Sequence, residues 1–274
     1  MATTQDHGKD IMTEKSIRIG DFFYNIASDD DYITNIGDTF EPHMCALFKS
    51  LVRSDHTVYD VGSNIGCTTI LFGNLARHVE SFEPSPTTFK ILERNVIASS
   101  LSNINVHNYG LGSVDESLTL TFSPFNRSGA FVSDLTQASA GHTVESIEIR
   151  RGDTFPIDRD PDFIKIDVEG YEKNVIEGLR NVINRSQPIV VLELNHWCLN
   201  AFQRVSIPDF FDFLISVFPI LYAIDGNRYL SLHDQSERYI CMYRHINQSQ
   251  YPNILGAFSS QQLLSFESHF IREV

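Results

Sequence analysis

Short apolar runs alternate with longer amphipathic stretches along most of this chain. Each run has the length of a strand, and the stretches between the runs repeat apolar residues at helical spacing. This alternation is typical of an α/β fold in which helices connect parallel strands. The expected strands are Thr57–Asp60, Val79–Phe82, Ile104–Asn108, Phe163–Asp167, Pro188–Leu194, Ile220–Ile224 and Tyr239–Tyr243. The expected helices are Met44–Leu51, Thr87–Ala98, Asn174–Ile183, Ile207–Val217 and Gln261–Phe270.

Two further segments have the loose alternation of hairpins. Ile17–Ala27 precedes the first helix, and Leu118–Ile149 surrounds a polar insertion at Asn126–Gly129 that either covers a site or is an ordinary surface hairpin. Hydrophobic residues make up 42% of the 274 positions, which is enough for one large core, so we expect one domain. The expected parts are a flexible tail (1–15), a cap (16–52), a Rossmann-like core (53–246) with a hairpin insertion (113–150), and a C-terminal extension (247–274).

A glycine turn directly after the first core strand indicates a nucleotide site. The strand, turn and helix read T-V-Y-D-V-G-S-N-I-G from Thr57 to Gly66. In the dinucleotide fingerprint G-x-G-x-x-G, the second and third glycines would fall at Asn64 and Cys67, so a pyrophosphate is poorly accommodated. Asp60 would repel a phosphate but attract a sulfonium. The turn therefore favours S-adenosylmethionine over NAD.

The ends of the next two strands supply further nucleotide contacts. Glu83 follows the second strand, about 20 residues past the turn, where an acidic side chain reaches ribose hydroxyls. Glu83 alone fits NAD equally well, and only its combination with Asp60 and Asn64 favours S-adenosylmethionine. The loop Asn108–Leu111 after the third strand is expected to flank the adenine.

Acidic residues crowd the end of the fourth strand, in F-I-K-I-D-V-E-G-Y-E. Glu169 and Glu172 either complement the dipole of the next helix or, with Asp167, surround a cation such as a sulfonium or a metal. His196 follows the fifth strand and is a candidate general base, although a lone histidine is more often structural. Glu41 either caps the first helix or contacts a cationic ligand.

Charge and cysteine usage exclude several classes of partner. The chain has 35 acidic and 21 basic residues, and a net charge of −14 repels nucleic acid. The four cysteines are far apart with no zinc-like pair, and no secretory leader opens the sequence, so a reduced cytoplasmic protein is expected. No apolar run approaches the length of about 20 residues needed for a membrane span. The oligomeric state, including a homodimer, stays open.

Four motifs together resemble the FkbM family of S-adenosylmethionine-dependent methyltransferases. They are Glu41-Pro42, D-V-G-S-N-I-G from Asp60, F-E-P-S-P from Phe82 and I-K-I-D-V-E-G-Y-E from Ile164, within a match that covers roughly residues 33–196. The resemblance implies a class I methyltransferase (Rossmann-like) α/β sandwich whose seven-stranded, mostly parallel sheet has an antiparallel last strand. It also implies O-methylation of a hydroxyl, commonly on a natural product or sugar. Ser63 stands where the family usually has alanine.

We expect two groups of site residues. The cofactor, with S-adenosylhomocysteine as its product form, is expected to contact Glu41, Asp60, Gly62, Ser63, Asn64, Gly66, Glu83, Pro84, Ser85, Gly110, Leu111 and Asp167. The hydroxylated small-molecule acceptor is expected to lie among Asp167, Glu169 and His196, one of which takes its proton. Replacement of Asp60 by alanine should weaken cofactor binding and leave the fold intact.

Three alternatives stay open beside this hypothesis. A magnesium-dependent enzyme would use the oxygens of Asp167, Glu169 and Glu193 as ligands. In the second alternative, the methyl group goes to a carboxyl or nitrogen of a small molecule or peptide. In the third, the fold is a scaffold that binds the cofactor without catalysis.

Overall fold

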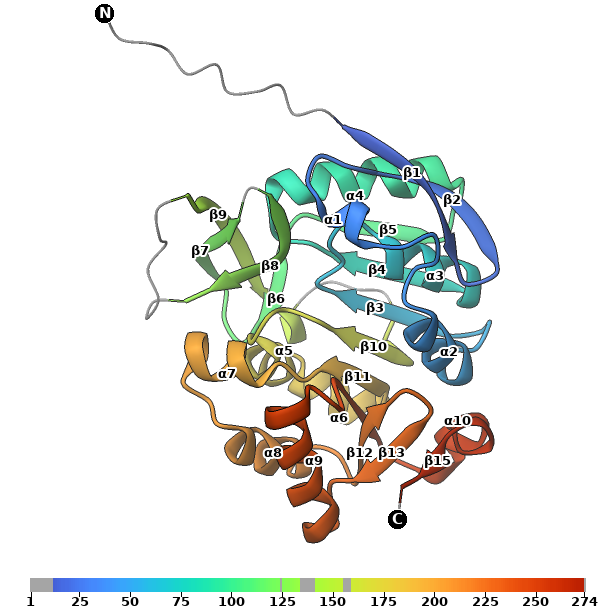
Figure 1. Cartoon of the computed structure of the whole chain (residues 1–274), viewed down its shortest axis with the longest axis vertical. Helices are drawn as coiled ribbons and strands as arrows, with labels where there is room; N and C mark the ends of the chain where they lie inside the picture. Colours follow the sequence, from blue (N-terminus) through green and yellow to red (C-terminus); the bar gives the residue numbers. More distant parts are fainter. Residues whose placement is uncertain (1–11, 124, 134–140, 155–158, 274) are drawn as a thin grey trace, which may run out of the picture.

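A nine-stranded mixed sheet forms the centre of the molecule (Figure 1). The computed structural model describes residues 12–123, 125–133, 141–154 and 159–273. Across the sheet the strands follow the order β15-β13-β12-β14-β11-β10-β3-β4-β5. Their bounds are β3 Thr57–Val61, β4 His78–Phe82, β5 Ile104–His107, β10 Phe163–Ile166, β11 Ile189–Glu193, β12 Ile220–Asp225, β13 Arg228–Ser231, β14 Asn253–Ala257 and β15 Ile271–Arg272.

The sheet is larger than the seven strands that we expected, and its antiparallel strands lie elsewhere in the chain. Strands β5, β4, β3, β10 and β11 are parallel, and β14 runs antiparallel between β11 and β12. Strand β13 is antiparallel to β12, and β15 is parallel to β13. The expected last strand, Tyr239–Tyr243, instead lies inside helix α9 (Gln235–Gln248). Cys241 and His245, four residues apart, are the buried positions of that helix. After residue 246, where the sequence predicted a C-terminal extension, the chain thus supplies β14 and β15 to the central sheet.

Helices cover both faces of this sheet because alternate strand residues point to opposite sides. Ile189 and Val191 of β11 pack on one side, and Val190 and Leu192 pack on the other. The first side is covered by α1 Tyr32–Asn35, α2 Pro42–Leu51, α3 Cys67–Leu75, α4 Pro86–Ser99, the 3-10 turn Ser260–Leu263 and α10 Leu264–His269. The second side is covered by α5 Glu172–Gly178, α6 Arg180–Ser186, α7 His196–Gln203, α8 Ile207–Ile215 and α9.

The stretch predicted as one helix, Asn174–Ile183, is divided in two. Leu179 separates α5 from α6, and a 3-10 turn, Gly152–Thr154, packs beside them. At the end of α5, Gly178 lies so close to β6 (Gly110–Gly112) that a Cβ atom would come within 1.7 Å of the Gly112 carbonyl oxygen. Only glycine fits this position.

An N-terminal hairpin lies over α4. Strands β1 (Thr13–Ile19) and β2 (Phe22–Ser28) pair antiparallel, which confirms the hairpin predicted from Ile17–Ala27. The Asn95 side chain of α4 joins the two elements, because it accepts from the Ala27 N–H at 2.8 Å and donates to the Ala27 carbonyl at 3.0 Å. Of the expected flexible tail, residues 13–15 belong to β1, and residues 1–11 lie outside the described residues.

A separate four-stranded sheet stands at the carboxyl ends of the central strands. Its order is β6-β9-β7-β8, with β7 Glu116–Ser123, β8 Asn126–Val132 and β9 Thr143–Arg151. This confirms the β structure predicted for Leu118–Ile149 where that range is described; residues 124 and 134–140 of it lie outside the described residues. Figure 1 shows β3, β4 and β10 pointing toward this sheet, so the carboxyl ends of these strands face the four-stranded sheet. No helix among the described residues combines the length and apolar composition needed to cross a bilayer.

Candidate active site

The glycine turn after β3 draws three strand ends together. Gly62 has a φ of 81°, and a Cβ atom there would lie 1.8 Å from the carbonyl oxygen of Asp167 at the end of β10. The N–H groups of Gly62 and Ser63 donate to the carbonyl of Phe82, at the end of β4, at 3.0 and 3.1 Å. Glycine is therefore required for β3 and β10 to approach this closely.

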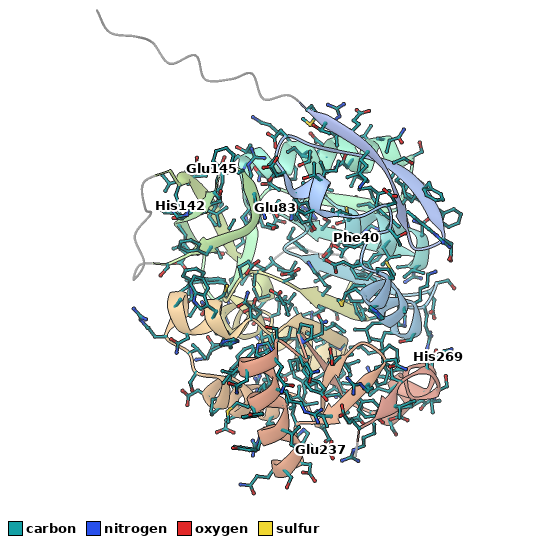
Figure 2. All side chains as sticks on the ribbon, viewed as in Figure 1. Phe40, Glu83, His142, Glu145, Glu237 and His269 are labelled. Carbon is teal, nitrogen blue, oxygen red and sulfur yellow. The ribbon has the colours of Figure 1, made fainter. Side chains whose placement is uncertain are left out.

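Glu83 lies directly after β4 and is held by the two loops around it. One carboxylate oxygen accepts from the Asn64 N–H and the other from the Ser85 N–H, both at 2.9 Å. The residue is only 7% exposed, and burial raises the pKa of its carboxyl to about 7 although these backbone donors oppose the change. In Figure 2, Glu83 lies between the central sheet and the four-stranded sheet, on which Glu145 accepts a hydrogen bond from Ser85. The carboxylate is thus fixed in orientation before any ligand binds.

The first pocket lies between these strand ends and the four-stranded sheet. One wall, formed by the ends of the central strands and by β6, contains nine of the expected site residues: Gly62, Asn64, Glu83, Pro84, Ser85, Gly110, Leu111, Asp167 and Glu169. Its opposite wall is mainly apolar and is formed by Leu120, Phe122, Ala130, Val132, Ile147 and Ile149. A cavity with one polar wall and one apolar wall suits a molecule that has a flat apolar part and a polar chain.

Three residues expected to contact the cofactor lie behind this wall. Asp60 is fully buried and accepts hydrogen bonds from the hydroxyls of Thr68 and Thr69 at 2.9 and 2.6 Å. The Ser63 hydroxyl donates to the Asp60 carbonyl at 2.8 Å. Gly66, with a φ of 98°, occupies the start of α3. The structure therefore gives these residues roles in shaping the turn.

Lys165, to which the sequence assigned no role, connects the buried acid to the site. Its ammonium lies 3.4 Å from Asp60 and 3.3 Å from Asp167, and it donates to the Gly62 carbonyl at 2.7 Å. Burial opposes its charge, but the two carboxylates prevail and hold the pKa of the ammonium above its ordinary value. The sequence signal was a single lysine within the apolar run I-K-I.

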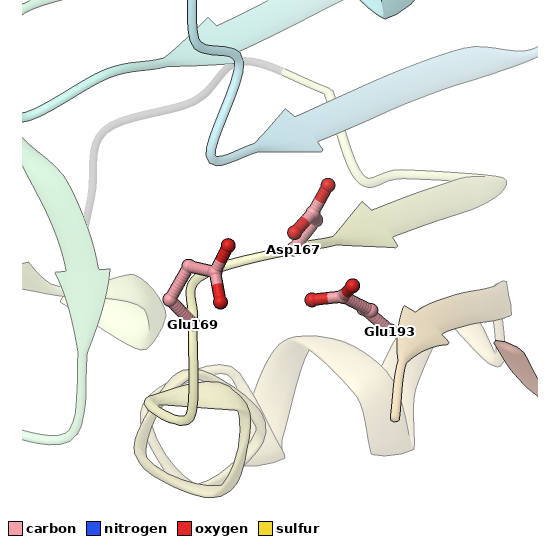
Figure 3. A group of neighbouring side chains, drawn as sticks. All are labelled: Asp167, Glu169 and Glu193. Atoms are coloured by element: carbon pink, nitrogen blue, oxygen red, sulfur yellow. The ribbon is translucent and has the colours of Figure 1, made fainter. Parts of the chain in front are cut away.

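Asp167, Glu169 and Glu193 form a group of three neighbouring carboxylates (Figure 3). Each offers an oxygen within 4.8 Å of the others. Burial, reinforced by Asp167, raises the pKa of Glu169 to about 7 and also raises that of Glu193. Like charges this close hold a proton or attract a cation. The folded chain thus brings together the three acids, Asp167, Glu169 and Glu193, that the sequence analysis named as the ligands of a magnesium-dependent alternative.

The backbone around Glu169 is held in an uncommon conformation. Its φ is 50°, in the left-handed region, and its carboxylate accepts from the Asn195 amide and the Cys198 thiol, both at 3.2 Å. Beneath it, the buried Glu172 accepts from the N–H groups of Val168 and Gly170 at 3.2 and 3.1 Å. Strain that the surrounding contacts maintain in this way often marks a functional loop.

His196 belongs neither to this group of carboxylates nor to the lining of the first pocket. It is the first residue of α7, and its ring packs edge-on against His245 of α9, with ring centroids 5.0 Å apart. Its backbone N–H donates to Nε2 of His245 at 3.4 Å. These contacts are those of a packing residue.

Glu41 lines a second pocket instead of the first. It precedes α2 with a φ of 28°, and its side chain makes no capping hydrogen bond to that helix. The residues that line the second pocket include Glu41, Met44, Lys165, Asp167, Val191, Glu193 and Asn253. Asp167 belongs to both pockets, which therefore meet at this carboxylate.

Comparison with known proteins places this geometry among methyltransferases. The family model of the methyltransferase FkbM domain matches residues 60–228. Hexuronic acid methyltransferase AglP of Haloferax volcanii is 28% identical over 155 residues, which cover 57% of this chain and 62% of that protein. Methyltransferase 1 of Beauveria bassiana is 30% identical over 147 residues, which cover 46% of this chain and 59% of that protein. The chain thus spans about three fifths of the length of these two relatives.

A solved structure of the same family is also similar. The FkbM methyltransferase of Methylobacillus flagellatus matches with a TM-score of 0.43 and 22% identity, over 62% of this chain and 42% of that one.

Proposed function

The chain belongs to the methyltransferase FkbM domain family, and from this premise we propose that it transfers the methyl group of S-adenosylmethionine to a hydroxyl oxygen of a small molecule. One observation carries the proposal. The first pocket has a buried ribose-type acid, Glu83, and meets a cluster of carboxylates at Asp167 and Glu169. A nucleoside site and a proton acceptor thus share one cavity.

The residues of the first pocket fit S-adenosylmethionine. Glu83 is buried and fixed by two N–H donors, and its remaining lone pairs suit ribose hydroxyls. Apolar side chains of the four-stranded sheet, such as Ile147 and Ile149, suit the adenine ring. Asp167 supplies negative charge where a sulfonium would be stabilised.

Catalysis by this chain would rest on positioning and proton transfer. The bound cofactor supplies a methyl group that is already activated by its positive sulfur. The two pockets hold the acceptor hydroxyl against that carbon, an effect able to contribute several kcal/mol or more. Glu169 takes the hydroxyl proton, because a base with a pKa of about 7 is ionised in part at neutral pH and still binds a proton well.

Divalent metal is a second candidate for the same carboxylates. The oxygens of Asp167, Glu169 and Glu193 lie within 4.8 Å of one another, and Mg²⁺ prefers such hard ligands. Lys165 already places a positive charge 3.3 Å from Asp167, which favours the metal-free alternative. Methyl transfer that persists after chelation and dialysis supports the metal-free enzyme, and activity restored only by Mg²⁺ supports the metal enzyme.

The proposal is tested by methyl transfer from isotopically labelled S-adenosylmethionine to a panel of hydroxylated, carboxylated and amino compounds. We expect label in an alkali-stable ether of a hydroxylated acceptor. Label in an ester or an amine would assign another acceptor atom. Cofactor binding without turnover on any acceptor would favour the scaffold alternative.

A further inference from the structure

The second pocket lies beside the first at the same edge of the central sheet. Lys165 and Asp167 at the end of β10, and Glu193 at the end of β11, form its floor. Glu41 borders it from the start of α2, and Asn253 from the start of β14. The two pockets share Asp167, and the carboxylate of Glu169 lies within 4.8 Å of Glu193. The proposed base therefore sits where the pockets meet.

Two acids of the second pocket, Glu41 and Glu193, have side-chain oxygens that the hydrogen bonds of the described residues leave unused. Glu41 takes an unusual backbone conformation at the start of α2, yet its side chain does not cap the helix. The Oε2 atom of Glu193 is buried and has no hydrogen-bond partner within the described part of the chain. Buried polar atoms are costly unless they are satisfied, so a cavity lined by such groups points to a ligand with hydrogen-bonding groups of its own.

The charge of this pocket limits what the ligand can be. Loss of solvent, followed by the charge of Asp167, raises the pKa of Glu193 to about 10, so this carboxyl holds a proton at neutral pH, and the same causes raise the pKa of Glu41. The cation that lines the pocket, Lys165, is already shared between Asp60 behind the pocket and Asp167. A further carboxylate would lose its water here without an unpaired cation to offset that loss.

We propose that the second pocket binds the methyl acceptor, and that it accepts a neutral polyhydroxylated molecule while rejecting its carboxylated counterpart. Carboxyl and amide groups such as those of Glu193 and Asn253 form hydrogen bonds with hydroxyls. Met44 and Val191 add the apolar contact that the C–H face of a sugar ring needs. The inference rests on the proposed methyl transfer. The neutral acceptor proposed for this chain differs in charge from the hexuronic acid in the name of its relative AglP.

Matched acceptor pairs test this selectivity. The probes are methyl glycosides of common neutral hexoses, each paired with the methyl glycoside of the corresponding uronic acid, in the presence of S-adenosylmethionine. We expect methyl transfer to at least one neutral glycoside, with kcat/KM at least about tenfold above that of its uronic acid partner, because a like charge in such a site costs more than this factor.

Removal of one pocket charge should relax the discrimination. Glu41→Gln keeps the shape and hydrogen-bonding capacity of the side chain, so the preference for the neutral partner should fall several-fold with no change in cofactor affinity. Glu93→Gln is the matched control, because Glu93 is an exposed residue of α4 outside both pockets. Glu93→Gln should leave the ratio of kcat/KM between the neutral glycoside and its uronic acid partner at the parent value.

Two results would overturn the inference. One is faster methylation of a uronic acid than of its neutral partner, and the other is turnover of no neutral glycoside by protein that binds the cofactor normally. A selectivity ratio in Glu41→Gln equal to that of Glu93→Gln would remove Glu41 from the acceptor site. Absence of cofactor binding is a different failure, since it would contradict the proposed function itself.

Discussion

Glu169 is the residue on which the proposed chemistry depends most. Its carboxyl has a pKa of about 7, and contacts with Asn195 and Cys198 fix its position. We predict that Glu169→Gln lowers kcat by about a hundredfold or more, while cofactor affinity stays within a few-fold of the parent. The parent rate should rise as pH increases through about 7, since the base must lose its proton, and this dependence should vanish in the variant.

His196→Asn is the control for this prediction, because His196 packs against His245 outside both pockets. It should retain the parent kcat. A hundredfold loss in His196→Asn together with normal activity in Glu169→Gln would reverse the assignment.

Asp60 has a structural task at the residue scale. It is fully buried, and its removal would leave the ammonium of Lys165 with only the partly exposed Asp167 as an ionic partner. We therefore predict that Asp60→Ala lowers the free energy of unfolding by about 3–5 kcal/mol, measured by urea denaturation. This replaces the expectation from the sequence that the fold would be unaffected.

The double variant Asp60→Ala, Lys165→Met serves as the control, because it removes the unpaired charge as well. It should regain part of the lost stability. Asp60→Ala with the stability of the parent would show that the buried pair does not matter to the fold.

The sequence located most pocket residues but could not orient every side chain. Motif spacing correctly brought Gly62, Asn64, Glu83 and Asp167 to one cavity, because parallel strand ends meet at one edge of a sheet. It could not show that Asp60 points behind the turn or that Glu41 faces the second pocket. Those directions depend on packing against Thr69 and α2, which local pattern does not encode. The binding roles of the pocket residues stay predictions.

At the scale of elements, an ion pair joins the four-stranded sheet to the N-terminal hairpin. The Arg127 guanidinium pairs with Asp29, with Nη2 at 3.0 Å from one carboxylate oxygen, and the Arg127 N–H donates to Asp30 at 2.9 Å. Both charged side chains are largely buried, with exposed fractions of 11% and 8%. Because Arg127 also lines the first pocket, this contact holds the apolar wall in place.

We predict that Arg127→Met loosens this wall without unfolding the molecule. Hydrogen exchange of backbone amides in β7 and β8 should become at least about tenfold faster, because the pair β7–β8 would open locally more often once Arg127 no longer anchors it. Arg53→Met is the control, since the Arg53 guanidinium pairs with the nearby exposed Asp55 and lies outside the first pocket. Equal protection of β7 and β8 in both variants would show that the pair does not anchor the hairpin.

The elements that the sequence misassigned have clear physical reasons. Tyr239–Tyr243 is rich in aromatic and β-branched residues, a local preference for strand that helical packing of Cys241 and His245 overrides. The antiparallel strand β14, which the sequence analysis missed, contains Gly256, where a Cβ atom would lie 2.6 Å from the Phe218 ring. That glycine weakens the strand signal locally but is required by a neighbour from another element. The parallel strands were predicted well because their apolar runs are buried on both faces.

At the scale of the whole molecule, the buried acids make stability depend on pH. Glu83, Glu169 and Glu172 each have a pKa of about 7 in the folded chain, against an ordinary value of 4.5. The folded chain therefore binds protons more tightly than the unfolded chain, and stability falls as pH rises. Burial lowers the pKa of His56 and His245 below 6.5, so their opposite effect is confined to lower pH.

We predict that the ligand-free protein loses stability between pH 6.5 and 8.5, by about 1 kcal/mol for each of the three acids. Urea denaturation at constant ionic strength measures this change. Glu193, whose pKa is also raised by burial, adds to this loss. Glu172→Gln should reduce the loss by about 1 kcal/mol, because it removes one of the titrating groups. Stability that is constant or rises across this range would contradict the protonation states described here.

The central claim is that the first pocket binds the sulfur nucleotide with Glu83 on its ribose. Calorimetric titration of ligand-free protein with S-adenosylmethionine, S-adenosylhomocysteine and NAD tests it most directly, with Glu83→Gln as the paired variant. We predict binding of both sulfur nucleotides, no binding of NAD, and at least about tenfold weaker binding in the variant, since a hydrogen bond to a charged group contributes about 1.5–3 kcal/mol. Binding of NAD alone, or equal affinity of parent and variant for the sulfur nucleotides, would contradict the account.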